Sequence, residues 1–188
     1  MKNIAITGSF ASGKSFVLNC LKNMGYMVFS CDDFIREAYK DIKLQDIVIG
    51  KIEGLEIFDK KRLSKIIYDD PQPRKELESI IHPIVRSGIR EFEEINKNQK
   101  FIFTEVPLLF ESNFDEYFSY SICVYCSEET RWQRAKERGV SNIDLYNKIK
   151  SVQFDQEEKK RRSDFVINSD TNQREIEKSL EKIIKKIA

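Results

Sequence analysis

The sequence predicts an α/β fold of three layers, in which helices cover both faces of a parallel five-stranded sheet. Short apolar runs alternate with helical patterns along the chain, and this order is typical of parallel sheets. The first apolar run, Asn3–Thr7, leads into a turn that contains glycine and then into a helical pattern. The 188 residues suit one domain with room for a helical insertion.

Each element is predicted from its own pattern. The expected strands are the apolar runs 3–7, 26–29, 101–106, 121–126 and 165–168. Apolar residues at three- and four-residue steps predict helices over 14–24, from 59, from 73 to 95 and over 172–187. Further helices are expected from 34, over the basic stretch 130–138 and over the polar stretch 142–162. Asp32 or Asp33 is placed to cap the second helix, and Pro83 predicts a kink or break near His82. Residues 40–58 show no clear pattern.

The turn after the first strand fits the phosphate-binding loop pattern, which is a Gly, four free positions and then Gly-Lys-Ser. It reads Gly8-Ser9-Phe10-Ala11-Ser12-Gly13-Lys14-Ser15. Glycines let backbone N–H groups line a concavity, and the start of the helix adds partial positive charge. An ordinary strand-to-helix turn is the alternative. The residues expected to bind ATP are Gly8, Ala11, Ser12, Gly13, Lys14, Ser15, Phe16 and Arg138.

Composition excludes several classes of function. Lys and Arg number 32 against 31 Asp and Glu, so no net field recruits nucleic acid or a membrane. We find neither a secretory segment nor an apolar run long enough to span a membrane, and we expect a cytoplasmic protein. Cys123 and Cys126 have half the spacing pattern of a zinc site. They fall in a strand-like run, however, where buried free thiols are common.

Three features beyond the loop favour a kinase that acts on a small molecule. Asp32 follows the second strand and could accept the proton of an acceptor hydroxyl. Glu105 ends the third strand and could hold Mg²⁺ through water. Arg131, Arg134 and Arg138 fall on one helix face, where guanidinium groups could offset phosphoryl charge. The alternatives are a helix cap for Asp32, a solvent-exposed carboxylate for Glu105 and a solvated face for the arginines. No guanine-reading motif was found.

Together these residues resemble the dephospho-coenzyme A kinase family, and the resemblance runs through nearly the whole chain. It is carried by residues 8–15, 28–32, Arg36-Glu37, 77–83, 106–111, Thr130, Arg134, Arg138, Gln153 and 163–168. The Pro-Leu-Leu-Phe-Glu block at 107–111 and the pair His82-Pro83 are its most specific parts. The resemblance implies transfer of the γ-phosphoryl group of ATP to the ribose 3′-hydroxyl of dephospho-coenzyme A, which is the last step of coenzyme A synthesis.

The resemblance also implies roles for residues and for parts of the single domain. The core would cover 1–32, 98–127 and 163–188, the acceptor-binding helical part 33–97, and the lid 128–160. The catalytic residues would be Asp32, Lys14, Arg134 and Arg138. Acceptor binding would fall to Asp32, Arg36, His82, Pro107, Leu108 and Leu109, and Mg²⁺ would lie on Ser15 and Glu105.

The sequence departs from the family pattern in four places. Ser30 and Cys31 stand where the family has Asp and Ala, so one carboxylate remains at that corner. Phe16 replaces a Thr, and Lys60 replaces an Arg whose bidentate contacts lysine cannot reproduce. Arg131 has no firm counterpart. The alternatives are a kinase for another metabolite, such as a nucleoside monophosphate, and a nucleotide-binding switch without catalysis.

Overall fold

The computed structural model describes all 188 residues and divides them into two compact units. The first unit comprises Met1–Ser30 and Glu93–Ala188, and the second comprises Cys31–Phe92. The first unit holds the sheet and the second is helical. No helix combines the length and the apolar character that crossing a membrane requires.

The sheet of the first unit has five strands, all of whose pairings are parallel. They are β1 (Lys2–Thr7), β2 (Met27–Ser30), β3 (Phe101–Glu105), β4 (Tyr120–Tyr125) and β5 (Phe165–Asn168), in the order β2-β3-β1-β4-β5. This confirms the predicted fold class, with some strand ends shifted by one residue. The central strand β1 leads into the phosphate loop, so the loop lies at the middle of the carboxyl edge of the sheet.

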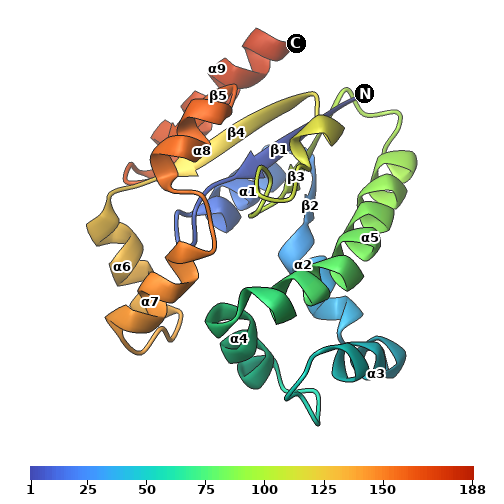
Figure 1. The fold of residues 1–188 in the computed structure, drawn as a ribbon. Helices are drawn as coiled ribbons and strands as arrows, with labels where there is room; N and C mark the ends of the chain where they lie inside the picture. The colour runs from blue at the N-terminus through green and yellow to red at the C-terminus, as the bar shows by residue number, and fades with distance from the viewer. The chain divides into compact units, whose positions relative to one another are not determined.

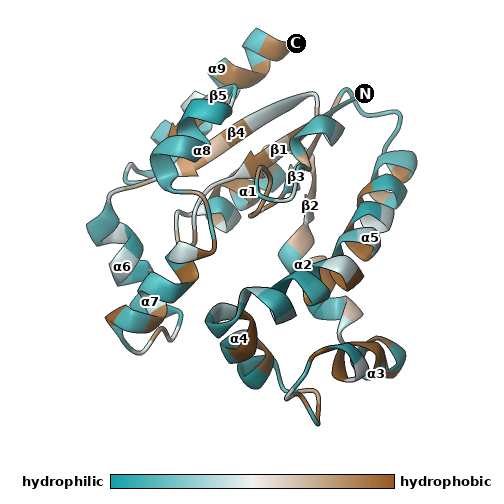
Figure 2. Cartoon of the chain, viewed as in Figure 1, coloured by the Kyte–Doolittle hydropathy of each residue, from teal (hydrophilic) through white to brown (hydrophobic).

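Helices cover both faces of the sheet (Figure 1). α1 (Lys14–Asn23) and α9 (Gln173–Ile187) contact each other and share one buried core with the strands. In α9 the buried positions are the predicted ones, namely Ile176, Leu180, Ile183, Ile184 and Ile187. Figure 2 shows the result as apolar strands beneath helices that carry polar outer faces.

The other face of the sheet contacts α8 (Gln156–Arg162), which packs on β4. All four cysteines are buried free thiols. Burial raises the pKa of Cys123 to about 11, although the nearby Lys159 charge acts in the opposite direction. This thiol therefore stays protonated at neutral pH, which fits the predicted role as a core residue.

The predicted single helix over 142–162 is wrong, because the structure has two helices there. α7 (Ile143–Ser151) is followed by its cap residue Val152, and Asp155 caps α8 by accepting a 2.7 Å hydrogen bond from the N–H of Glu158. Between them, the N–H of Phe154 donates to Glu111 instead of to a helical carbonyl. The preceding helix α6 (Glu128–Glu137) ends as predicted, since Gly139 follows it with φ of +88°.

The second unit holds α2 (Cys31–Ala38), α3 (Ile42–Lys51), α4 (Lys60–Asp69) and most of α5 (Pro71–Ile95). A short 3₁₀ helix, Asp115–Tyr117, belongs to the first unit. The unpredicted α3 is capped by Asp41, and α4 is capped by Asp59. α2 begins at Cys31, so neither Asp32 nor Asp33 is the predicted cap; both lie in its first turn.

Helix α5 runs through Pro83 without a break, because the tertiary packing of its apolar face holds both sides of the proline. Its two halves run in different directions in Figure 1. Gly88 lets α2 approach closely, since a Cβ there would lie 2.5 Å from the ring of Phe34. Buried apolar side chains of these helices form a core within this unit.

Candidate active site at the carboxyl edge of the sheet

The phosphate loop needs its glycines for two reasons. Gly8 and Gly13 have φ of +147° and +96°, which L side chains rarely adopt. A Cβ on Gly8 would lie 2.2 Å from the carbonyl oxygen of Val124, and one on Gly13 would lie 2.9 Å from Ser169 Oγ. The start of α1 lacks a side-chain cap, as the predicted anion site requires.

Lys14 is the first residue of α1, and only 7% of it is exposed. Its ammonium group donates hydrogen bonds to the carbonyl oxygens of Gly8 and Ser9, at 3.0 and 3.2 Å. The positive charge of Lys14 thus lies against the first two residues of the phosphate loop. An ammonium group in this position can move to phosphate oxygens with little change in the backbone.

Ser15, Glu105 and Ser30 meet where three strands end. Ser15 Oγ donates to Glu105 Oε1 at 3.4 Å, and Ser30 Oγ donates to Glu105 Oε2 at 2.8 Å. Only 3% of Glu105 is exposed. No group of three or more His, Cys, Asp and Glu residues is arranged to hold a metal ion. One hydroxyl and one carboxylate nevertheless fit Mg²⁺, which takes few protein oxygens and completes its shell with water and phosphate.

The three arginines of α6 are not equivalent. Arg134 donates two 2.8 Å bonds to Ser169, one to the hydroxyl and one to the carbonyl oxygen. Ser169 in turn donates to the carbonyl oxygen of Ser12 at 2.6 Å. Arg138 is exposed at the end of α6, and its guanidinium group forms no hydrogen bond or ion pair within the chain. The structure thus brings Arg134 to the loop and leaves Arg138 accessible.

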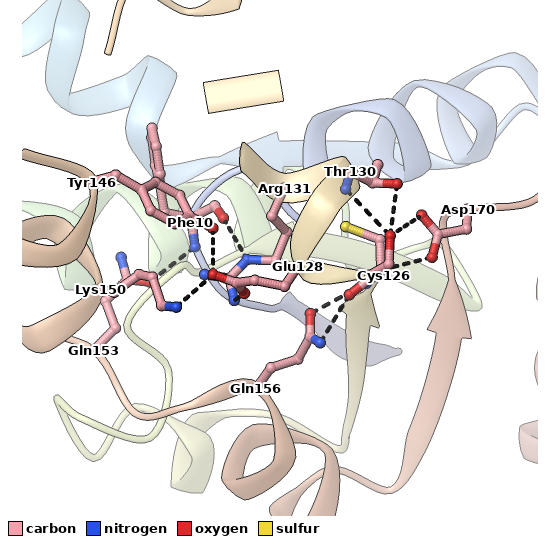
Figure 3. A network of polar contacts seen from close by, with 11 residues as sticks. Phe10, Cys126, Glu128, Thr130, Arg131, Tyr146, Lys150, Gln153, Gln156 and Asp170 are labelled. Atoms are coloured by element: carbon pink, nitrogen blue, oxygen red, sulfur yellow. Dashed lines mark hydrogen bonds and ion pairs between the residues drawn. The ribbon is translucent and has the colours of Figure 1, made fainter. Parts of the chain in front are cut away.

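Arg131, whose role the sequence left open, is buried beside the tip of the loop. Its Nε donates to the carbonyl oxygen of Phe10 at 3.2 Å, and Gln153 Oε1 accepts a 2.9 Å bond from the N–H of Phe10 (Figure 3). Neither Gln153 nor Ser169 was among the predicted site residues, although Gln153 is one of the residues that carry the family resemblance. Ser169 lies outside the motifs, and its contact with the backbone of Ser12 leaves no local sequence signal. Phe16 lies at 45% exposure on the first turn of α1.

The block that follows β3 faces both the core and the surface. Leu109 is fully buried, whereas Pro107 and Leu108 are partly exposed. Lys159 is fully buried and lies 2.9 Å from Glu111 Oε1, and it donates a 2.6 Å bond to the carbonyl oxygen of Pro107. Burial lowers the pKa of Lys159, and the charge of Glu111 opposes that shift. This buried pair fixes the block from beneath.

Within the second unit, Asp32 is exposed on the first turn of α2. Burial raises the pKa of Tyr68 on α4, and the negative charge of Asp32 adds to that shift. Arg36 forms an exposed 2.7 Å ion pair with Asp33. His82 is half-buried in α5, and its burial lowers its pKa.

The second unit also has a pocket of about 800 Å³ beside α4. Lys61, Arg62 and Lys65 line it together with acidic residues, among them Asp69 and Asp70. None of the predicted acceptor-binding residues lines this pocket. We therefore do not assign this pocket to acceptor binding.

The chain resembles known proteins over nearly its whole length. A family model described as Dephospho-CoA kinase matches residues 2–175. A dephospho-CoA kinase of Rickettsia typhi is 43% identical over 187 residues, covering 100% of this chain and 98% of the relative. That of Fusobacterium nucleatum is 32% identical and covers 98% and 97%.

Solved structures are also similar to this chain. The dephospho-CoA kinase of Campylobacter jejuni has a TM-score of 0.67 at 26% identity, covering 98% of this chain and 96% of that chain. A shikimate kinase of Acinetobacter baumannii has a TM-score of 0.58 at 13% identity, covering 99% and 94%, and shares the fold alone. Because the family model and the relatives span nearly the full length, the chain belongs to the dephospho-CoA kinase family.

Proposed function

We propose that this chain transfers the γ-phosphoryl group of ATP to the ribose 3′-hydroxyl of dephospho-coenzyme A. The membership of the family supports the reaction, and the carboxyl edge of the sheet supports the chemistry. The observation that carries the proposal is the arrangement of Lys14, Ser15 and Glu105 at the phosphate loop. The loop supplies inward N–H groups, Lys14 supplies a mobile charge, and Glu105 supplies a carboxylate beside the Ser15 hydroxyl.

Asp32 is the proposed acceptor-side base. It lies two residues after Ser30, the last residue of β2, and its carboxylate is exposed. A carboxylate can orient the 3′-hydroxyl and take its proton while the oxygen attacks the γ-phosphorus in line. We assign Arg36, His82, Pro107, Leu108 and Leu109 to the acceptor; since the Leu109 side chain is buried, its contact would be through the backbone.

Charge on the moving phosphoryl group is offset by Lys14 and by two arginines. Arg138 is accessible and unpaired, so it can reach the phosphates without breaking another contact. Arg134 is held by Ser169 close to Gly13 and acts from a fixed position. We assign residues 128–160 to a lid that excludes water, which would otherwise compete as acceptor, and residues 33–97 to the acceptor-binding part.

Mg²⁺ fits the site described above, with Ser15 as a direct ligand and Glu105 acting through water. When bound, it would neutralise charge on the β- and γ-phosphate oxygens. We place the protein in the cytoplasm, because none of its four cysteines is in a disulfide, as is usual in a reducing compartment.

The proposal is tested by ADP release in the presence of a panel of acceptors, namely dephospho-coenzyme A, AMP, CMP and shikimate. We expect turnover with dephospho-coenzyme A to exceed that with every other acceptor, and ³¹P NMR of the product to show a 3′-phosphomonoester. Equal or faster turnover with AMP, CMP or shikimate would contradict the assignment. Nucleotide binding without ADP release on any acceptor would favour a non-catalytic switch.

A further inference from the structure

Both backbone hydrogen-bonding groups of Phe10, at the tip of the phosphate loop, are occupied by side chains from one distant segment. Arg131 on α6 donates to the carbonyl oxygen at 3.2 Å, and Gln153, between α7 and α8, accepts from the N–H at 2.9 Å. The two partners lie 121 and 143 residues away in the chain. Figure 3 shows them on either side of the tip.

These two bonds set the directions of two peptide planes. In a trans peptide the C=O and the following N–H point in opposite directions. Gln153 draws the Phe10 N–H outward, which turns the carbonyl oxygen of Ser9 inward, where Lys14 Nζ donates to it at 3.2 Å. Arg131 draws the Phe10 carbonyl outward, which turns the N–H of Ala11 into the concavity.

The Ala11 position needs such support. Its φ is +61°, a left-handed conformation that costs an alanine free energy and persists only where the surroundings impose it. Ala11 is also almost completely buried, with 1% exposed. A loop free to relax would lose the inward direction of this N–H.

Arg131 is itself fixed before any ligand arrives. Its side chain is 5% exposed, and its Nη1 donates to Glu128 Oε2 at 2.9 Å. The guanidinium carbon lies 5.9 Å from the centre of the Tyr146 ring, and the Tyr146 hydroxyl donates to the same Glu128 at 3.0 Å. Lys150 forms an ion pair with Glu128 as well. The network therefore leaves Arg131 one orientation, with its Nε toward the loop.

We propose that Arg131 and Gln153 are positioning residues for the triphosphate of ATP. They act through the backbone of Phe10, keeping the Ala11 N–H directed at phosphate oxygens and the Ser9 carbonyl directed at Lys14. The inference rests on the proposed function, since it assigns these residues to the ATP side of the phosphate loop.

A matched pair of glutamines tests it. Gln156 is partly exposed like Gln153, starts α8, and makes two bonds to the backbone of Cys126, at 3.2 and 2.9 Å, rather than to the loop. Gln153→Met and Gln156→Met both remove backbone contacts of the same segment. We expect Gln153→Met to raise the KM for ATP about fivefold, the change that loss of one ordinary hydrogen bond produces.

In Gln153→Met the KM for dephospho-coenzyme A should stay unchanged, because the loop is on the ATP side. Gln156→Met should leave the KM for ATP unchanged, because its bonds go to Cys126 and not to the phosphate loop, although its Tm falls as much as that of Gln153→Met or more. Arg131→Lys keeps a charge near Glu128 but loses the planar donor fork, and should raise the KM for ATP about tenfold. Circular dichroism checks that each variant folds.

The kinetic results distinguish failure of this inference from failure of the proposed function. An ATP-selective rise in KM for both Gln153→Met and Arg131→Lys, with Gln156→Met unaffected, supports the inference. Unchanged KM for ATP in Gln153→Met, or an equal rise in Gln156→Met, overturns it while the wild type remains an active kinase. A wild type that neither binds ATP nor releases ADP would instead overturn the proposed function itself.

Discussion

The hydroxyl of Ser30 donates a 2.8 Å hydrogen bond to the carboxylate of Glu105, where β2 and β3 end side by side in register. A hydroxyl at this place donates to the Glu105 carboxylate and fixes its orientation, which an ionised carboxylate could not do because it only accepts hydrogen bonds. Glu105 thus stays available as the one carboxylate beside Ser15.

Ser30→Ala should weaken Mg²⁺ binding at the site without abolishing activity. It removes one bond that orients Glu105, so we expect the Mg²⁺ concentration for half-maximal activity to rise about threefold to tenfold. Ser121→Ala is the control, since Ser121 Oγ donates to Asp164 at 2.9 Å in the same sheet. An identical Mg²⁺ titration curve for Ser30→Ala and the wild type would show that Glu105 is not oriented for metal.

Lys14→Ala should lower kcat on the order of a hundredfold or more, because it removes a charge that offsets the transferring phosphoryl group. The fold should persist by circular dichroism, since Gly8 and Ser9 lose only a side-chain partner. Lys22→Ala, near the exposed end of the same helix, is the matched control and should keep full activity. Activity within a fewfold of wild type in Lys14→Ala would remove this residue from catalysis.

Lys159→Met should destabilise the protein by about 3 to 5 kcal/mol, because it leaves the Glu111 carboxylate, a mostly buried charge, without its cation. Replacing both residues, as Lys159→Met with Glu111→Gln, should recover most of that loss. Urea denaturation of both single variants and the double variant gives the coupling energy. A double variant no more stable than Lys159→Met would show that the pair is not a unit.

His82 predicts a pH dependence of stability. Burial holds its pKa in the folded state below the ordinary value of 6.5, so the unfolded chain binds more protons between the two values. The free energy of unfolding should therefore rise with pH through that interval and level off above about 6.5. His82→Gln should remove this rise, and since the chain has one histidine, urea denaturation at several pH values isolates it. An unchanged pH profile of stability in His82→Gln would show that His82 does not cause the rise.

Local patterns predicted the elements whose stability is local. The strand before Gly8, the helix after Lys14 and the stop at Gly139 all follow from apolar spacing and glycine conformation. The split of the helix predicted over 142–162 had a local signal that the prediction missed, because Asp155 caps α8 by accepting from the N–H of Glu158. The contact just before it could not be read in this way, because the N–H of Phe154 donates to Glu111, far away in the chain.

The site shows the same division. The motif identified Lys14 and Ser15, because phosphate chemistry demands those residue types at that spacing. It could not show that Arg131 and Arg134, which lie seven and four residues before Arg138, are bound to backbone and serine groups while Arg138 stays exposed. Side chains that hold a loop through its backbone can come from any sequence that reaches it.

In the proposed reaction, Asp32 orients the acceptor hydroxyl and takes its proton while the phosphate loop holds the triphosphate of ATP. Single-turnover transfer in Asp32→Asn tests this role most directly. Asp33→Asn, which loses an exposed ion pair of small energy, is the control on the same helix turn. We predict that Asp32→Asn binds ATP as tightly as the wild type and transfers phosphate about a hundredfold more slowly or worse, with Asp33→Asn near normal. Transfer at the wild-type rate in Asp32→Asn would contradict the account.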